Sequence, residues 1–179
     1  MGDAYYIAYT QRLDKLCDYE VNPNIAVVSQ FMCAPTDKEA QARAEGSSFF
    51  QFALRYYATH APGVPGGIHL WDEFQAYTQT PAGRNARLGG LIGSPETIRS
   101  RLRRFEQSQV DQVILLNQAG HNTHADICSS LELFATDVMP EFHAREGHHQ
   151  EWKHGVLSGE ITLDEIDTEP FATQRRGGR

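Results

Sequence analysis

The sequence has no long apolar run and no surplus of positive charge, and each lack excludes a class of protein. No stretch approaches the ~20 apolar residues that a membrane-spanning helix needs. Lys and Arg number 16 against 23 Asp and Glu, which gives a formal net charge of −7. Surfaces for nucleic acid or anionic membranes need clustered cations. We therefore expect no nucleic acid and no membrane among the partners.

The N-terminus also lacks targeting signals. Residues 1–6 contain neither the basic segment nor the apolar stretch of a signal peptide. Tyr6 stands where the myristoylation pattern requires Ser or Thr. These absences predict a soluble, cytoplasmic protein.

Cysteine is scarce, and the histidines follow no metal-binding pattern. Cys17, Cys33 and Cys128 are odd in number, far apart and set in apolar patterns, so we expect buried thiols and no disulfide framework. His121 and His124 are three residues apart, but neither this spacing nor the histidines of residues 143–154 match a known zinc site. The sequence therefore predicts no metal site, and we expect these histidines to lie at the surface by chance.

Apolar periodicity predicts strands that alternate with amphipathic helices. This alternation is typical of right-handed βαβ units on a parallel sheet. Thr36 and Glu39 form a capping box at the start of a long helix that contains Gly46. The expected strands are residues 25–33, 88–92 and 110–116, and the expected loops are 60–67 and 81–85. The expected helices are about 5–20, 36–58 and 71–77, one that starts with Pro95 and buries Ile98, Leu102 and Phe105, and one through residues 127–138 that ends near Pro140.

Four ordered motifs in residues 88–142 carry a family resemblance. They are Gly93–Glu96 (GSPE), Val110–Leu116 (VDQVILL), Gly120 with His121, and Ser130–Phe142 (SLELFATDVMPEF). This segment resembles the C-terminal end of the luciferase-like monooxygenases, which are flavin-dependent oxidoreductases. Residues 5–58 fit the preceding family unit less closely.

The resemblance implies an α/β fold that is a partial (β/α)8 TIM barrel. The three strands would be roughly its sixth, seventh and eighth, because a full barrel typically needs ~250 residues. Residues 1–142 would form the C-terminal portion of the barrel, and residues 143–179 a loosely packed C-terminal extension. The family's usual catalytic histidine and most flavin contacts belong to the first five strands, so the catalytic residues are unknown.

A polar loop follows the last predicted strand, where TIM barrels hold their active sites. By this placement Asn117, Gln118, Gly120 and His121 are candidate cofactor-binding residues. Asn117 and Gln118 can hydrogen-bond an isoalloxazine edge, and Gly120 allows close backbone approach. The structural alternative is a polar turn that begins the next helix.

The implied chemistry is oxygen activation by reduced flavin, followed by oxygenation of a small organic substrate. The resemblance implies reduced FMN, with the deazaflavin F420 as the alternative, and a flavin reductase as the source of reduced flavin. The alternative function is a non-catalytic truncated barrel. Such a chain would need a partner to complete the fold, either as a homo-oligomer or with a complementing N-terminal half, because open strand edges must be covered.

Two further patterns have competing interpretations. Gly93–Glu96 could present backbone N–H groups to a phosphate, but plain capping by Ser94 with Pro95 at the first helical position is favoured. Trp71, Phe74 and Tyr77 could form a lid over the barrel mouth, but core packing of a short helix is favoured.

Overall fold

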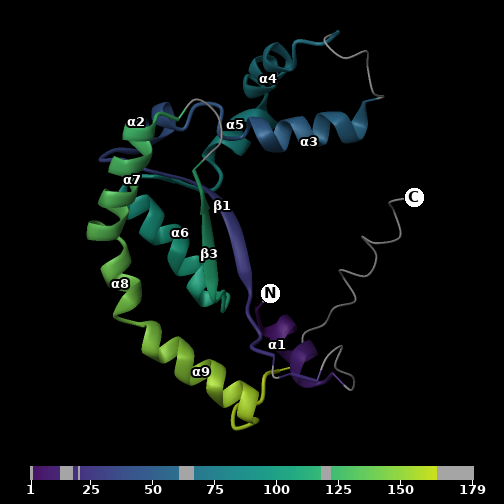
Figure 1. Ribbon diagram of the computed structural model, residues 1–179, viewed down its shortest axis with the longest axis vertical. Coiled ribbons are helices and arrows are strands. Elements are labelled where there is room, and N and C mark those ends of the chain that lie inside the picture. The colour runs from purple at the N-terminus through teal and green to yellow at the C-terminus, as the bar shows by residue number, and fades with distance from the viewer. Residues whose placement is uncertain (1, 13–17, 20, 61–66, 118–121, 165–179) are drawn as a thin grey trace.

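The computed structural model describes residues 2–12, 18–19, 21–60, 67–117 and 122–164. In this part of the chain, helices surround three parallel strands (Figure 1). The elements are α1 (Gly2–Thr10), β1 (Ala26–Cys33), α2 (Asp37–Arg43), α3 (Phe49–Thr59), α4 (Leu70–Thr78), α5 (Pro81–Leu88), β2 (Leu91–Gly93), α6 (Pro95–Gln107), β3 (Gln112–Leu116), α7 (His124–Asp137), α8 (Met139–His143) and α9 (Glu146–Ser158).

The strands form an open sheet in the order β2-β1-β3. The first part of β1, Ala26–Gln30, pairs with β3, and its last part, Phe31–Cys33, pairs with β2. This arrangement confirms an α/β fold with a parallel sheet. The order differs from that of three successive barrel strands, in which each strand pairs with the next one in sequence. The described residues form no closed barrel.

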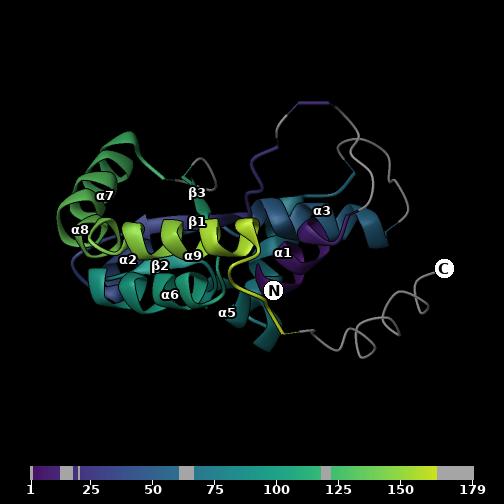
Figure 2. The same cartoon turned by 90° about the horizontal axis from the view of Figure 1, so that it is seen from below.

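One face of the sheet is covered along its length. Side chains alternate between the faces of a strand, and Phe31 and Cys33 point to the same side. There they pack with Leu91 of β2 and with Ile98 and Leu102 of α6. In Figure 2 α6 lies beneath the strands. This apolar layer is the main core.

The opposite face is covered only at one end. Met32 packs there with Ala40 and Ala44, at the end where α2 lies. At the other end Val28 and Ile114 face each other across β1 and β3, and they are 62% and 45% exposed. Parallel sheets in proteins bury both faces, so half of this face has no cover among the described residues.

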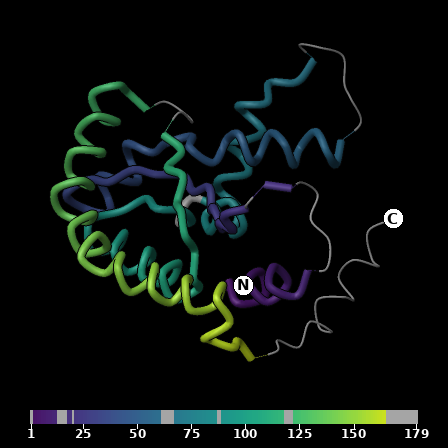
Figure 3. The backbone as a smooth tube through the Cα atoms, turned by 60° about the horizontal axis from the view of Figure 1, so that its bottom comes forward, coloured from purple at the N-terminus to yellow at the C-terminus, as the bar shows by residue number. Residues whose placement is uncertain are grey.

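Helices α3 and α4 form an aromatic hairpin that extends away from the sheet (Figures 1 and 3). Phe49 and Phe52 of α3 contact Phe74 of α4, with ring centroids 5.3 and 5.5 Å apart. Trp71 packs beside them, 5.3 Å from Phe49. The rings of α4 therefore pack against a neighbouring helix, which confirms the core-packing interpretation over a lid.

Two predicted segments, one helix and one loop, were wrong, each for a local reason. The helix expected over residues 36–58 is broken into α2 and α3, because Gly46 adopts a left-handed φ of 81°. The loop expected at residues 81–85 is the start of α5. Thr80 caps that helix by accepting from the Gly83 N–H at 3.0 Å, and Pro81 suits its first position.

The expectation of a loosely packed extension after residue 142 was also wrong in part. Residues 146–158 form α9, in which Lys153, Gly155 and Val156 are buried. Helix α9 packs against α1 near the N-terminus. The sequence pattern was weak here because α9 buries a charged residue and a glycine instead of an apolar stripe. Residues 165–179 lie outside the described part.

Candidate functional site

The residue expected to contact flavin lies where topology predicted, at the carboxyl end of β3. Asn117 is half-buried, and its backbone oxygen accepts from Asn122 Nδ2 at 2.9 Å. The side-chain Oδ1 atoms of both asparagines are buried without a hydrogen-bond partner among the described residues. Buried acceptors are usually paired. The other three candidates, Gln118, Gly120 and His121, lie outside the described residues.

The carboxyl ends of β1 and β2 are joined by an acidic side chain. Asp37 accepts from the Ser94 N–H at 2.7 Å and from Thr97 Oγ1 at 3.0 Å. The Ser94 backbone hydrogen bond, followed by the Thr97 hydroxyl, lowers the pKa of Asp37. This carboxylate occupies the N-terminus of α6, where a phosphate would bind. The capping interpretation of Gly93–Glu96 is confirmed, with Ser94 as N-cap.

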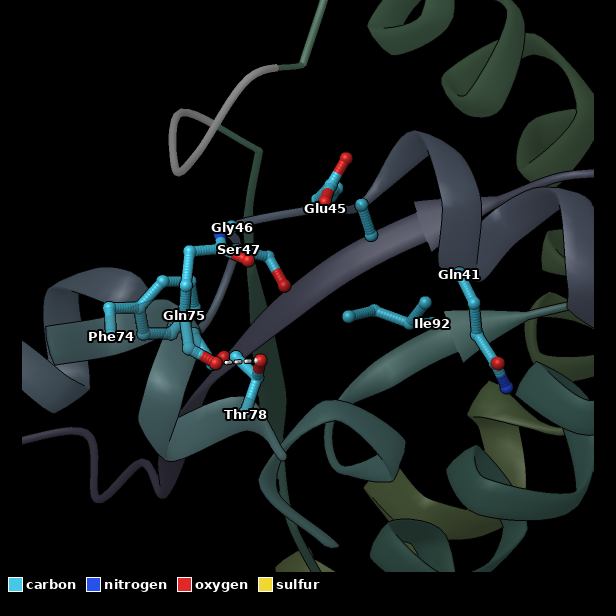
Figure 4. Close-up of a pocket in the computed structure, with 10 residues that line it drawn as sticks. Gln41, Glu45, Gly46, Ser47, Phe74, Gln75, Thr78 and Ile92 are labelled. Atoms are coloured by element: carbon cyan, nitrogen blue, oxygen red, sulfur yellow. Dashed lines mark hydrogen bonds between the residues drawn. The ribbon is translucent and has the colours of Figure 1, made fainter. Parts of the chain in front are cut away.

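A small cavity lies beside these strand ends, between α2, α4 and Ile92 of β2 (Figure 4). The Gln75 carbonyl accepts from Thr78 Oγ1 there at 2.7 Å. The cavity holds ≈ 20 Å³, which is room for a single water molecule. It is too small for an organic cofactor.

The densest polar cluster lies at the opposite, amino end of β3. The Asp111 carboxylate accepts from Tyr6 Oη at 2.8 Å, from the Ile25 N–H at 2.7 Å, and from His149 Nε2 and Lys153 Nζ at 3.0 Å each. Its side chain is only 5% exposed. These four donors come from α1, from Ile25 just before β1, and from α9, so Asp111 joins three separate segments at the amino end of β3.

The environment of Asp111 changes two pKa values. Burial raises the pKa of the carboxyl, but hydrogen bonds from Ile25, His149, Lys153 and Tyr6 outweigh it, and the net pKa is lowered. Burial, and then the hydrogen bond to Asp111, raise the pKa of Tyr6. Tyr6 is therefore a neutral donor and Asp111 an ionised acceptor at neutral pH.

Aromatic rings pack around this polar cluster. Trp152 contacts the Tyr6 ring edge-on at 5.2 Å and stacks with the His149 ring at 5.7 Å. The acceptor capacity of Asp111 is filled by its donors, so the cluster is suited to hold segments together rather than to bind substrate.

Sequence analysis missed this cluster. Asp111 was interpreted as part of a strand motif and His149 as a chance surface histidine. Its members are far apart in the chain, since Tyr6 precedes Asp111 by 105 residues and Lys153 follows it by 42. An acidic residue that begins an apolar strand was the available signal, because a buried carboxylate needs donors.

The thiols match their prediction in part. Cys33 is buried, whereas Cys128 is half-exposed and lies 3.5 Å from His124 Nε2. Cys17 lies outside the described residues.

Within residues 2–12, 18–19, 21–60, 67–117 and 122–164 no three His, Cys, Asp or Glu side chains are grouped as a metal site. The helices of this part are too short or too polar to cross a membrane.

Comparison with known proteins adds no assignment, since no family model, curated protein or solved structure matches the chain. The resemblance to luciferase-like monooxygenases stays a prediction from the motifs.

The described residues do not by themselves form an FMN site. Only Asn117 of the four expected contacts is placed, and it lines none of the four cavities characterised in the structure. Asp37 already occupies the α6 N-terminus. A flavin would need further residues beyond these.

Proposed function

We propose that the chain is the C-terminal portion of a luciferase-like, flavin-dependent oxidoreductase built as a (β/α)8 barrel. The whole enzyme would use reduced FMN, or alternatively F420, and O2 to oxygenate a small organic substrate. The motifs of residues 88–142 support this assignment. The parallel pairing of the strands, with α6 and α7 after β2 and β3, is compatible with it, whereas the order β2-β1-β3 is not that of three successive barrel strands.

Asn117 is the observation that carries the proposal. It follows a parallel strand directly, and ligands of α/β proteins bind outside the carboxyl ends of such strands. Its buried Oδ1 lacks a partner among the described residues, so it is ready to accept a hydrogen bond from a bound molecule. The cofactor would supply the oxygen chemistry, and this chain would help to orient it.

The isolated chain should be inactive and should not bind flavin. It places one expected contact, and half of one sheet face is uncovered. An additional layer of strands would cover Val28 and Ile114, and would bring the remaining flavin contacts of the family to the carboxyl end of β3.

Flavin titration tests the proposal. The full chain is titrated with FMN alone, and again after mixing with the five-strand N-terminal portion of a luciferase-like oxidoreductase. We expect no saturable quenching alone and micromolar binding by the mixture. Asn117→Ala should weaken that binding at least fivefold. The matched control Glu132→Ala changes an exposed residue of α7 and should leave it unchanged. A stable mixed complex without flavin binding would contradict the proposal.

A second candidate function is a non-catalytic partial barrel that acts by pairing with another chain. The exposed Val28–Ile114 pair favours it, as does a second apolar surface on α3. Phe50, Leu54 and Tyr57 lie there at helical spacing and are 58%, 58% and 64% exposed. Helix residues three and four apart share a face, so these side chains form one stripe. Exposed apolar surfaces of this kind mark interaction sites.

A further inference from the structure

A mainly apolar cavity lies between β3 and the helices that cover it. It has a volume of ≈ 280 Å³. Apolar side chains of α6, β3, α7 and α8, together with Val110 between α6 and β3, form most of its wall. They are Leu102, Phe105, Val110, Val113, Phe134, Met139 and Phe142.

Two polar networks fix the mouth of this cavity. Arg145 donates to both carboxylate oxygens of Glu106 at 2.9 Å each, which ties α6 to the segment between α8 and α9. On the other side, His149 is held between Asp111 at 3.0 Å and Gln109 Oε1 at 3.3 Å. The cavity is open in this structure, and these bonds join the segments that flank it.

The size of the cavity sets the class of ligand. A volume of ≈ 280 Å³ would hold about nine waters at ~30 Å³ each, but water needs several polar partners and these walls are mainly apolar. Apolar cavities of roughly 150 Å³ already accommodate benzene. A helix or a peptide strand is too large. A one- or two-ring organic molecule fits.

The charges at the mouth set the polarity of the ligand. Three carboxylates line it, Glu106, Asp111 and Glu146, against the single guanidinium of Arg145. Arg145 is already committed to Glu106 and Glu141. Glu106 is paired with Arg145 and Asp111 with Lys153, so Glu146 is the lining carboxylate that forms no ion pair among the described residues. An anionic ligand would meet its negative charge, whereas a neutral one would not be repelled. His143, an exposed side chain on the lining, offers a ring nitrogen to a hydroxyl or N–H group.

We propose that this cavity is a binding site for a small, neutral, mainly aromatic molecule with one hydrogen-bonding group. The site lies at the amino end of β3, whereas Asn117 lies at the carboxyl end. It is therefore separate from the flavin site proposed above and does not depend on it. Small-molecule sites have this composition, with mainly apolar walls and a few convergent polar groups.

Indole is a suitable probe, with benzoate as a charged comparison of similar size. The labelled full chain is titrated with each and followed by amide NMR shifts. We expect saturable indole binding with shifts concentrated at Val113, Phe134 and Phe142, and at least tenfold weaker binding of benzoate. Absence of saturable binding, or shifts that centre on Val28 and Ile114, would overturn the proposal.

Val113→Phe fills the cavity from the strand and should weaken indole binding at least tenfold. The matched control is Leu115→Phe, which adds the same ring on the same face of β3 but does not line the cavity. It should keep binding within twofold. Equal loss in both variants would contradict the assignment.

A third variant covers the case in which Val113→Phe does not fold. Met139→Ala enlarges the cavity and should increase the affinity for 2-naphthol relative to indole at least threefold. An unchanged preference in that variant would also overturn the proposal.

Discussion

Asp111 shows how one side chain can decide the arrangement of distant segments. It is nearly buried, yet it is ionised, because a backbone N–H, a hydroxyl, an imidazole and an ammonium group surround it. A buried ion pair adds little net stability over a well-packed apolar pair, but removal of one partner leaves the other charge buried and uncompensated. Lys153, with 9% of its side chain exposed, would be left in that state.

Asp111→Ala should therefore lower the free energy of unfolding by about 3–5 kcal/mol. Urea denaturation measures this change. Glu132→Ala on the exposed side of α7 is the control and should stay within about 0.5 kcal/mol of the original chain. A loss below about 1 kcal/mol for Asp111→Ala would show that the cluster does not hold the segments together.

The lowered pKa of Asp111 predicts loss of stability in acid. Its contribution is fully present above the ordinary aspartate pKa of 3.8 and is lost as the pH falls through the lower folded-state pKa. The unfolding free energies of the original chain and of Asp111→Asn should thus differ most above pH 4 and converge below it. Urea titrations at pH 5 and pH 3 compare them. A constant difference would contradict the assigned pKa direction.

The two described thiols should differ in reactivity. Cys33 is fully buried, and burial, followed by the charge of Asp137, raises its pKa to about 11. Alkylation needs an accessible thiolate. Cys128 is half-exposed, so iodoacetamide at pH 8 should modify it at least tenfold faster than Cys33, as measured by peptide mass mapping. In urea, where the chain is unfolded, both thiols should react at similar rates, and this measurement is the reference. Equal alkylation rates of Cys33 and Cys128 in the folded chain would contradict the burial of Cys33.

At the scale of elements, single glycines decide where helices stop. Gly46 has a φ of 81° in the turn between α2 and α3, whereas Gly147 lies within α9 and has nothing near the position of an added Cβ. Left-handed backbone costs an L-residue about 1–2 kcal/mol, and a helical glycine is about 1 kcal/mol worse than alanine. The same substitution should therefore have opposite effects at the two sites.

Gly46→Ala should lower the unfolding free energy by about 1–2 kcal/mol, and Gly147→Ala should raise it by up to about 1 kcal/mol. Thermal melts of both variants give the melting temperatures, and urea titrations give the corresponding unfolding free energies. If Gly46→Ala were stabilising, α2 and α3 would form one continuous helix, as the sequence pattern alone suggested.

The elements with complete local signals were predictable from sequence. The strands β1 and β3 carry strong apolar runs, and α6 has both Ser94 as N-cap and Pro95 behind it. Where the prediction was wrong, the deciding interaction was invisible in the local pattern. Helix α9 packs through Lys153 and Gly155. A search for apolar periodicity does not detect a helix that packs through such residues.

The candidate site was predictable only in its position. Topology places Asn117 at the carboxyl end of a strand, and the structure agrees. The Asp111 cluster and the apolar cavity arise from residues of separate segments that meet through tertiary packing. The order β2-β1-β3 was likewise not encoded locally, because apolar strands do not specify which neighbour they pair with.

At the scale of the whole molecule, the uncovered half of the sheet predicts association. Val28→Lys with Ile114→Lys places two charges on that face without altering the core side. If the face binds another chain, this double variant should convert a homo-oligomer to monomer, or should abolish binding of an N-terminal barrel half. Light scattering measures both changes. The double variant Phe50→Lys with Tyr57→Lys tests the apolar stripe on α3 separately, because it should disrupt assembly only if that stripe is the interface. Unchanged assembly in both would contradict a pairing role.

The pairing of β1 with β3 also has a consequence for synthesis of the chain. Ile25 and Asp111, which bond at the start of this pairing, are 86 residues apart. At roughly 5–20 residues per second, the ribosome completes β3 about 4–17 s after β1 has been made. During that interval the apolar strand Ala26–Cys33 has no partner on the side that β3 later occupies. The nascent chain should therefore be a substrate for chaperones that bind exposed apolar segments, until translation passes Leu116.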